Sequence, residues 1–433
     1  MVEKETLRRI VFQQKGQIVP RRGMVEREML SRALSMFSDN KVLVISGMRR
    51  SGKSTLLSQM MAKMGGFCYA GFEDERLAGF CAQDFELLDD VLMEAYGEAG
   101  TYFFDEVQNV DGFELFVRRL QDSGKRVLIT GSNASLLSKE LGSRLTGRYR
   151  LLELYPFSFS EYLKLRGVPG GQSRHLPHTR ARLSSLLRRY LEEGGLPEYL
   201  AGGDLDDVRT LFDNILYRDI IARYSIRSQR QLKELVNLLM ASVASRFTYN
   251  SAKKALGVSN SITVKEYVGH LSNAYLFFEL PQFSFSVKEQ LGSPRKIYVC
   301  DPAFYQVMGP AFSQNTGRLL ENAVYIELRR HYRGLFYHSG KGECDFLVCE
   351  GMKVRQAIQA SSSLAGENRK REIDGLAEAM GRFGLKEGTI VTLDEEAEIE
   401  AGGGKIHVLP AWRWMALQRG EGENKPRKIS KKN

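Results

Sequence analysis

Apolar residues along this chain follow two different periods, which predict buried strands connected by amphipathic helices. Four short apolar stretches have strand character, at 42–46, 67–70, 101–106 and 125–133. Continuous apolar runs of this length are typical of strands buried inside a sheet. Residues 24–37 instead carry apolar side chains at helical spacing, and residues 7–22 are interpreted as an extended approach segment. The alternation predicts an α/β fold for this part of the chain.

A glycine-rich turn follows the first of these strands. The sequence GMRRSGKS at 47–54 fits the pattern GxxxxGK(S/T), and a helical stretch follows it. This order directs backbone N–H groups and the positive end of the helix at one point, and the glycines allow a tight turn. We expect a phosphate cradle made of Gly47, Met48, Arg49, Arg50, Ser51, Gly52, Lys53, Ser54 and Thr55. Lys53 is predicted to contact the β- and γ-phosphates of ATP, and Ser54 to bind Mg²⁺. A chance match of the pattern is the alternative.

Two acids end the strand predicted at 101–106. Open α/β sheets bind their ligands at the carboxyl ends of the strands. Asp105 is therefore predicted to hold Mg²⁺, directly or through water, and Glu106 to orient and deprotonate the attacking water. Neighbouring side chains on a strand point in opposite directions, which allows the two acids different tasks. The alternative is a strand that merely ends in acids.

Small polar residues and then arginines follow the strand predicted at 125–133. Asn133, or Ser132, is predicted to hydrogen-bond the γ-phosphate and the water, or else to cap the helix that follows. Arg148 is the first candidate, and Arg144 the second, for an arginine that stabilises the transferred phosphoryl group. Such an arginine acts within its own subunit or on a neighbouring one, and both arrangements stay open. Arginines on a solvated turn are an equally good interpretation.

These motifs resemble a known family. GMRRSGKS, FEDERL, FFDEVQNV, LITGSNASLL and LTGRYRLLELYPFSFSEYL are similar, in this order, to AAA-type ATP-binding proteins of bacteria and archaea. The later stretches YLEEGGLPEYL, LYRDII, PRKIYVCDPAF and GRLLENAVYIEL also resemble that family, so the likeness covers nearly the whole chain. It implies an ASCE-type core with the catalytic glutamate on an extra strand beside the P-loop strand, and a C-terminal domain of unknown function. It also implies Walker A, Walker B and sensor roles for Lys53, Ser54, Asp105, Glu106 and Asn133.

The domains are predicted from changes in pattern and from this likeness. We expect a P-loop core at 1–165, a helical lid at 166–228, a winged-helix-like module at 229–290, a nuclease-like α/β domain at 291–418 and a basic disordered tail at 419–433. The lid is inferred by analogy with AAA-type proteins.

The third of these segments has the order helix, helix-turn-helix and β-hairpin, which is typical of a winged helix. Its two strands are expected at 275–280 and 283–287. The second helix of the motif carries Thr263, Lys265 and Glu266 where contacts to DNA would lie. Because that helix is not strongly basic, packing or protein contact is at least as good an interpretation.

The fourth segment has the layout of the PD-(D/E)xK nucleases, in which carboxylates hold Mg²⁺ and a lysine supports the attacking water. Glu321 or Glu327 and Asp345 fit the first two positions. The third position reads Gln359-Ala360-Ser361 and so lacks both the acid and the lysine. We therefore expect a nuclease-like fold with an inactive site, which binds DNA or only partner proteins.

Composition narrows the class of protein. Hydrophobic residues make up 43% and charged residues 26% of the 433 residues, as in ordinary globular proteins. The five cysteines form no metal-type pair, and no apolar run approaches the roughly 20 residues of a membrane span, so we expect a cytoplasmic protein. The net charge is +10, and the basic tail at 419–433 either contacts nucleic acid or is solvated.

The sequence favours an ATP-hydrolysing P-loop protein of AAA type that uses ATP and Mg²⁺. Hydrolysis is expected to drive a conformational change, with DNA, a partner protein or a second copy of the chain as the open choices of partner. A nucleotide-gated switch that binds DNA or protein with little turnover is the alternative. An active nuclease is disfavoured by the Gln-Ala-Ser sequence.

Overall fold

The chain folds as two compact units, and neither follows the sequence continuously. The computed structural model describes residues 2–18, 24–132, 147–168, 177–309 and 316–417. Unit 1 comprises Met1–Phe157, Leu196–Arg227 and Tyr267–Leu276, and unit 2 comprises Ser158–Gly195, Ser228–Glu266 and Phe277–Asn433. The segment expected at 166–228 as a lid is thus divided between the two units.

A five-stranded parallel sheet forms the centre of unit 1 and confirms the predicted α/β class. Its order is β2-β3-β4-β1-β5. The strands are β1 (Val42–Ser46), β2 (Phe67–Gly71), β3 (Thr101–Asp105), β4 (Arg126–Gly131) and β5 (Tyr149–Glu153). The strands beside β1 are β4 and β5, so the expectation that the acid-bearing strand adjoins the P-loop strand is wrong. β4 pairs with both β1 and β3 and separates them.

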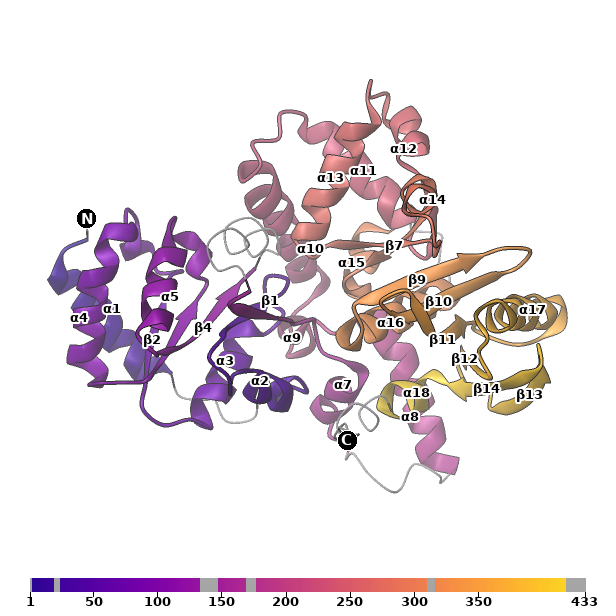
Figure 1. Cartoon of the computed structure of the whole chain (residues 1–433), viewed down its shortest axis with the longest axis horizontal. Helices are drawn as coiled ribbons and strands as arrows, with labels where there is room; N and C mark the ends of the chain where they lie inside the picture. Colours follow the sequence, from indigo (N-terminus) through magenta and orange to yellow (C-terminus); the bar gives the residue numbers. More distant parts are fainter. Residues whose placement is uncertain (1, 19–23, 133–146, 169–176, 310–315, 418–433) are drawn as a thin grey trace, which may run out of the picture. The chain divides into compact units, whose positions relative to one another are not determined.

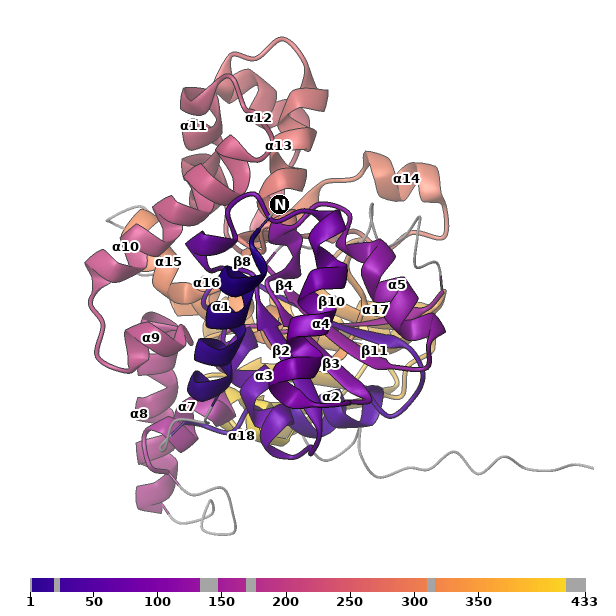
Figure 2. The ribbon, with the colours of Figure 1, turned by 90° about the vertical axis from the view of Figure 1, so that its left-hand side faces the viewer.

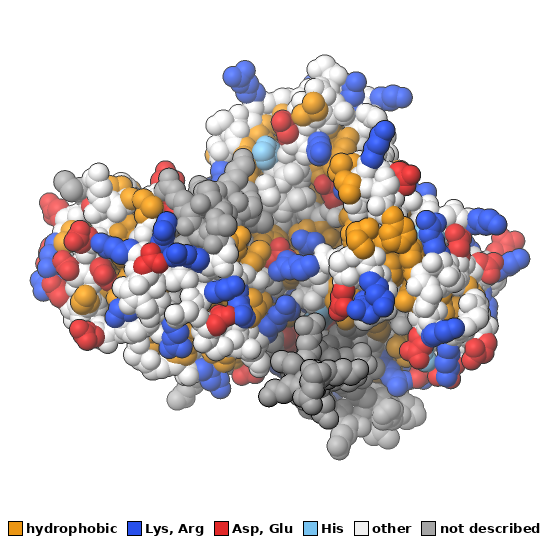
Figure 3. Space-filling view, viewed as in Figure 1, with side chains coloured by type: hydrophobic (Ala, Val, Ile, Leu, Met, Phe, Trp, Pro, Cys, Tyr) orange, Lys and Arg blue, Asp and Glu red, His pale blue; other side chains and the backbone are white. Residues whose placement is uncertain are grey.

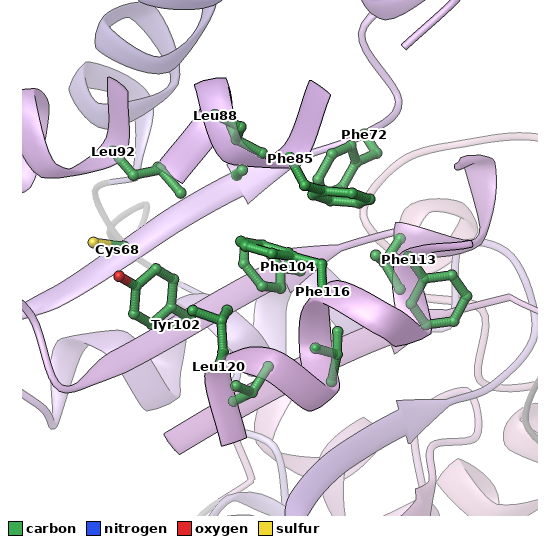
Figure 4. Close-up of a cluster of buried hydrophobic side chains, with 14 of the residues drawn as sticks. Cys68, Phe72, Phe85, Leu88, Leu92, Tyr102, Phe104, Phe113, Phe116 and Leu120 are labelled. Carbon is green, nitrogen blue, oxygen red and sulfur yellow. The ribbon is translucent and has the colours of Figure 1, made fainter. Parts of the chain in front are cut away.

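Helices cover both faces of this sheet (Figures 1 and 2). One face is covered by α1 (Lys4–Gln17), α4 (Phe85–Tyr96) and α5 (Phe113–Asp122), and the other by α2 (Leu30–Met36) and α3 (Lys53–Ala62). The sheet's side chains alternate accordingly, with Tyr102 and Phe104 in one core and Phe103 in the other. Figure 4 shows the first core, in which the Phe85 and Phe116 rings stack at 4.6 Å.

The helix α1 corrects one expectation. Residues 7–22 were interpreted as extended, but the chain is helical up to Gln17. Leu7, Ile10 and Val11 are buried, and Leu7 and Val11 belong to the core that α4 and α5 share. Their spacing places them on one helical face, which is the signal that the sequence interpretation passed over.

Short helical elements complete unit 1. Among the described residues, 3₁₀ turns lie in its loops at η1 (Glu75–Leu77), η2 (Ala82–Asp84) and η3 (Val107–Asn109). The segment Leu196–Arg227 contains α9 (Pro197–Leu200), α10 (Leu205–Asn214) and the π-helix η5 (Ile215–Ala222). π-Helical turns are rare and occur frequently at functional sites.

Unit 2 begins with helices and a small sheet. Its elements up to residue 308 are α7 (Phe159–Leu165), α8 (Pro177–Glu193), α11 (Gln229–Ala241), β6 (Ser245–Phe247), α12 (Tyr249–Leu256), β7 (Phe277–Pro281), α14 (Val287–Gly292), β8 (Arg295–Val299) and α15 (Pro302–Met308). Helix α13 (Ser261–Asn273) begins in unit 2 and ends in unit 1. The sheet order is β6-β8-β7. The strand expected at 283–287 is wrong, because β7 pairs with β8 instead and α14 begins at Val287.

A six-stranded mixed sheet forms the rest of unit 2. Its order is β13-β14-β12-β11-β10-β9. The strands are β9 (Gly334–Ser339), β10 (Glu343–Glu350), β11 (Lys353–Ala360), β12 (Glu387–Thr392), β13 (Ala397–Ala401) and β14 (Gly404–Pro410). The accompanying helices are α16 (Thr316–His331), α17 (Gly366–Phe383) and α18 (Ala411–Leu417). Among the described residues, none forms a helix long and apolar enough to cross a membrane.

Candidate nucleotide site

The P-loop of unit 1 connects β1 directly to α3. Gly52 adopts φ +92°, a left-handed conformation that glycine accepts without steric strain, and α3 begins at Lys53. A Cβ atom on Gly47 would lie 2.1 Å from the carbonyl oxygen of Leu154, so no larger residue fits there. The two glycines therefore shape the turn through different constraints, one conformational and one steric.

A buried arginine fastens this loop from outside the motif. Arg27 donates from Nη1 to the Ser51 carbonyl at 2.6 Å and from Nη2 to the Tyr155 carbonyl at 2.7 Å. Its guanidinium also lies over the Phe157 ring, 5.2 Å from the centroid. Arg27 thereby links the loop to the chain that follows β5. The sequence interpretation missed it, because nothing local distinguishes Arg27 from a surface arginine.

Four predicted residues from two segments of the chain meet at the end of the loop. The Lys53 ammonium lies 3.0 Å from Glu106 Oε1 and donates to the Met48 carbonyl at 3.2 Å. The Ser54 hydroxyl hydrogen-bonds with the Asp105 carboxylate. All of these except Ser54 are almost fully buried. The P-loop and the acid pair thus form one cluster at the carboxyl end of the sheet.

Glu106 is held by residues from β4 and from the turn after β3. It adopts a left-handed conformation at φ +52°, uncommon for a residue with a side chain. Its backbone N–H donates to Thr130 Oγ1 at 2.9 Å, and Thr130 in turn donates to Asp105 Oδ1. Gln108 donates to Glu106 Oε2, and its Nε2 lies 3.3 Å from Ser132 Oγ. Thr130 and Gln108 are further contacts that the sequence interpretation did not name.

The two neighbouring acids have pKa values shifted in opposite directions. Burial raises the pKa of Asp105, and the charge of Glu106 adds to the rise against the hydrogen bonds from Thr130 and Ser54. Burial also works to raise the pKa of Glu106, but the charge of Lys53, the hydrogen bond from Gln108 and the charge of Arg49 outweigh it. The pKa of Glu106 therefore lies below its ordinary value, and its carboxylate is ionised at neutral pH.

The two arginines of the P-loop pair with acids from elsewhere in unit 1. Arg49 binds Asp219 through Nε at 3.1 Å and Nη2 at 3.3 Å, and binds Glu73 through Nη1 at 3.1 Å. Asp219 belongs to the π-helix η5. Arg50, with φ +61°, binds Glu198 Oε2 at 2.6 Å. The P-loop is therefore tied to the segment Leu196–Arg227 by two ion pairs.

The predicted arginine at position 148 does not join this cluster. Arg148 directly precedes β5 and pairs with Asp122 at 2.5 Å, and the next residue, Tyr149, pairs with Val42 at the start of β1. The P-loop follows the other end of β1, where Ser46 pairs with Glu153. At about 3.3 Å per residue, Arg148 lies roughly 16 Å from that end. Asn133 and Arg144, the other predicted residues, lie outside the described part of the chain.

The residues present fit a magnesium ion beside a triphosphate. Ser54 and Asp105 offer adjacent hydroxyl and carboxylate oxygens, the hard donors that Mg²⁺ prefers. The glycine-shaped loop presents backbone N–H groups ahead of α3, and Lys53 adds a positive charge. The arrangement can therefore accommodate a phosphate chain together with a divalent ion.

Unit 2 brings a second set of predicted residues together. Glu321 of α16 and Asp345 of β10 both contact the Lys296 ammonium, at 2.9 and 2.7 Å. Gln359 Oε1 accepts from the Asp345 N–H at 3.0 Å. Glu327, the alternative to Glu321, instead pairs with Arg330 on its own helix. Lys296, from β8, was not foreseen as part of this set.

Comparison with known proteins gives family matches for two regions. Residues 39–163 match the family model of an AAA domain, and residues 184–315 match that of a domain of unknown function (DUF8612). An uncharacterized protein of Methanocaldococcus jannaschii is 32% identical over 437 residues, which cover 96% of each chain. An uncharacterized protein of Haemophilus influenzae is 32% identical over 348 residues, covering 76% of this chain and 84% of the relative.

Comparison with solved structures gives distant matches. The Walker-type ATPase PABY2304 of Pyrococcus abyssi is 17% identical, with a TM-score of 0.44, over 67% of this chain and 97% of that chain. AMPPCP-bound DnaA from Aquifex aeolicus is 14% identical, with a TM-score of 0.29, over 57% of this chain and 86% of that chain.

Proposed function

Because this chain belongs to one family with its Methanocaldococcus jannaschii relative and contains an AAA domain, we propose that it binds Mg-ATP and hydrolyses it to ADP and phosphate. The convergence of Lys53, Asp105 and Glu106 carries the proposal. These residues come from two segments of the chain and are buried together at the carboxyl end of a parallel sheet. Burying three charged groups is unfavourable, and the packing of the sheet does not require it. A site for a charged ligand explains their presence.

Each residue has a distinct role in the proposed reaction. The loop N–H groups and Lys53 bind the β- and γ-phosphates. Ser54 and Asp105 would hold Mg²⁺, which would supply positive charge to the phosphate oxygens. Glu106 accepts a proton from the attacking water as the new bond to the γ-phosphorus forms and the bond to the β,γ-bridging oxygen breaks. The low pKa of Glu106 keeps it in the ionised form that this step needs.

Arg49 is proposed as the positive charge that acts within the same chain. It belongs to the P-loop, and its charge is felt by Glu106. Arrival of a triphosphate offers this guanidinium new acceptors in place of Asp219 and Glu73. Release of Asp219 would change the contacts of the π-helix η5, so that nucleotide binding reaches the segment Leu196–Arg227. Asn133 remains a proposed sensor and Arg148 a proposed finger acting on a neighbouring subunit.

The test is ATP turnover by the purified chain and by Glu106→Gln. Glutamine keeps the shape of the side chain but accepts no proton, so turnover should fall at least about 100-fold, the contribution typical of a general base. Binding of Mg-ATP should persist, which isothermal titration measures in the same preparation. Turnover equal to that of the unchanged protein would remove Glu106 from the mechanism.

A nucleotide-gated switch is the second candidate, and the Arg49–Asp219 pair favours it. In such a switch, ATP binding changes the conformation of the chain, and ATP is hydrolysed only slowly. The proposed winged-helix module would then contact DNA or protein through α13, on which Lys265 and Glu266 are exposed. Affinity for duplex DNA, measured by fluorescence anisotropy with and without nucleotide at several salt concentrations, tests this role. DNA binding that ignores both nucleotide and salt would argue against the switch.

A further inference from the structure

Unit 2 contains a polar cavity that the proposed ATPase reaction does not use. Its volume is about 760 Å³, within the range of small-molecule sites. Side chains of β8, α16, β10 and α17 line it, together with the turn between β9 and β10. Buried charged groups at the base of a cavity need an explanation, because burial without partners is unfavourable.

A single ammonium group contacts three acids of this cavity. Lys296 Nζ lies 2.6 Å from Glu343 Oε1, 2.7 Å from Asp345 Oδ1 and 2.9 Å from Glu321 Oε1. The lysine side chain is only 3% exposed. An ammonium has three N–H donors, and here each has a carboxylate acceptor. Lys296 is thus surrounded by acids much as a metal ion is surrounded by its ligands.

Further contacts hold these carboxylates in position. Asp345 Oδ2 accepts from the Ala360 N–H at 3.0 Å, and Tyr298 donates to Glu321 Oε1 at 2.8 Å. Arg246 donates to Glu343 Oε2 at 2.9 Å. The acids are therefore positioned by the fold and not by the lysine alone.

The charges in the cluster are strongly coupled. Burial works to lower the pKa of Lys296, but the charges of Asp345, Glu321 and Glu343 outweigh it and raise the pKa well above its ordinary value. Burial and the charge of Asp345 raise the pKa of Glu321 to about 8. The lysine is consequently charged at neutral pH.

We propose that Lys296 is the resident cation of this cavity, and that its ammonium occupies the position where Glu321, Glu343 and Asp345 would otherwise bind a divalent metal ion. The native cavity then works without a metal. Metal-activated water is not part of its chemistry, in contrast to the magnesium proposed for the P-loop. Ca²⁺ binds carboxylate oxygens at about 2.3–2.6 Å in flexible geometry, so the three acids, now 2.6–2.9 Å from the nitrogen, would need to move inward only slightly. Removing the ammonium should therefore turn the cavity into a divalent-cation site.

The experiment replaces Lys296 by methionine in the full chain. Methionine has nearly the length of the lysine stem but carries no charge. Binding is measured with Tb³⁺, a Ca²⁺ probe whose luminescence is excited through a nearby tyrosine, here Tyr298. Lys296→Met should show a saturable signal that Ca²⁺ displaces, and Ca²⁺ should raise its melting temperature. The matched control is Lys341→Met, which loses a lysine from the same cavity but has no carboxylate cluster around it among the described residues.

The native chain, Lys341→Met and the double variant Lys296→Met, Asp345→Asn should show no such signal. An equal, Asp345-dependent signal from the native chain would overturn the proposal, and so would a folded Lys296→Met that binds no ion. Circular dichroism checks folding. If Lys296→Met and Lys296→Gln unfold without metal, recovery on adding Ca²⁺ supports the proposal, and failure to recover at any Ca²⁺ concentration overturns it.

Discussion

Lys53 and Glu106 neutralise each other at 3.0 Å in the P-loop cluster, so each affects the other's chemistry. Changing Lys53 to Met removes the charge that would face the phosphates. ATP affinity should fall at least about tenfold, which corresponds to about 1.4 kcal/mol. Isothermal titration with Mg-ATP measures this, and Lys63→Met, at the exposed end of the same helix, is the control. Equal affinities of the two variants would contradict the proposed role.

Arg27 gives a prediction for stability at the same scale. Arg27→Met leaves the carbonyl groups of Ser51 and Tyr155 buried without their donors. Each unsatisfied buried acceptor costs about 1–3 kcal/mol, so the loss for the two carbonyl groups should be about 2–6 kcal/mol. Arg118→Met, which breaks only an exposed pair with Asp122, should cost under about 1 kcal/mol. Urea unfolding followed by circular dichroism compares the two variants. Similar unfolding midpoints would show that the hydrogen bonds from Arg27 to the P-loop do not stabilise the fold.

Asp301 makes stability depend on pH. Burial raises the pKa of Asp301 from 3.8 to about 7, against hydrogen bonds from Ala303 and Gly195. The folded chain therefore binds more protons at this residue than the unfolded chain between these values. Its contribution to stability is present below about pH 4, declines as pH rises and is lost above about pH 7.

Asp301→Asn removes this titration. The unfolding free energy of the native chain, relative to Asp301→Asn, should decline between pH 4 and pH 7 by a few kcal/mol, because each pKa unit corresponds to about 1.4 kcal/mol. Groups such as Glu321 titrate in both proteins and cancel in the comparison. A relative stability that stays constant over this range would show that Asp301 is not the responsible group.

At the scale of elements, motifs that are continuous in sequence were predictable and contacts between distant segments were not. The β1–P-loop–α3 stretch and the acids after β3 follow from local patterns. Lys296 and Arg27 carry no local signature. The role of Lys296 arises only when β8 meets α16, and that of Arg27 only when the segment before α2 meets the P-loop and the chain after β5. The π-helix η5 lies in the segment predicted as a helical lid, but its π-helical hydrogen bonding was not predicted. A change in the hydrogen-bonding pattern of a helix does not depend on a recognisable residue type.

The junction between α8 and α15 provides an element-scale prediction. Gly194 has φ +75°, and a Cβ atom there would lie 1.9 Å from Asp301 Oδ1. Asp301 also caps α15 by accepting from the Ala303 N–H at 2.9 Å, so it has little freedom to move. Gly194→Ala should therefore destabilise the chain by more than the roughly 1–2 kcal/mol of left-handed strain alone.

Gly384 supplies the matched control for that substitution. It has φ +66° at the end of α17, and no atom would lie within 4 Å of an added Cβ. Gly384→Ala should cost only the conformational strain. Thermal unfolding of both variants measures the difference, and equal losses would mean that the contact with Asp301 has no energetic consequence.

At the scale of the whole molecule, net charge says little about a specific partner. The chain carries a charge of +10, but basic and acidic side chains are interspersed on the face shown in Figure 3. Mixed surface charge of this kind favours solubility and weakens any simple electrostatic argument for DNA. At this scale the proposed role of Arg148 depends on whether copies of the chain form an oligomer when ATP binds.

Substitution of Arg148 tests whether ATP drives the chain to oligomerise. The position of Arg148 at the start of β5, roughly 16 Å along the sheet from the P-loop end, separates it from the phosphates of its own chain. Its exposed pair with Asp122 is worth at most about 1 kcal/mol and leaves it accessible to a second copy. For a chain that stays monomeric with ATP, we expect Arg148→Ala to leave turnover within about twofold of the native value, whereas Arg49→Ala should lower it at least about tenfold.

The measurement combines turnover with particle mass from light scattering, with and without Mg-ATP. If ATP drives assembly, mixing Arg148→Ala with Lys53→Met should restore turnover that neither variant has alone, because one supplies an intact P-loop and the other an intact arginine. Loss of turnover in a monomeric Arg148→Ala would contradict the geometry. It would require the arginine to reach its own phosphates across the length of β5, which the pairing of Val42 with Tyr149 prevents.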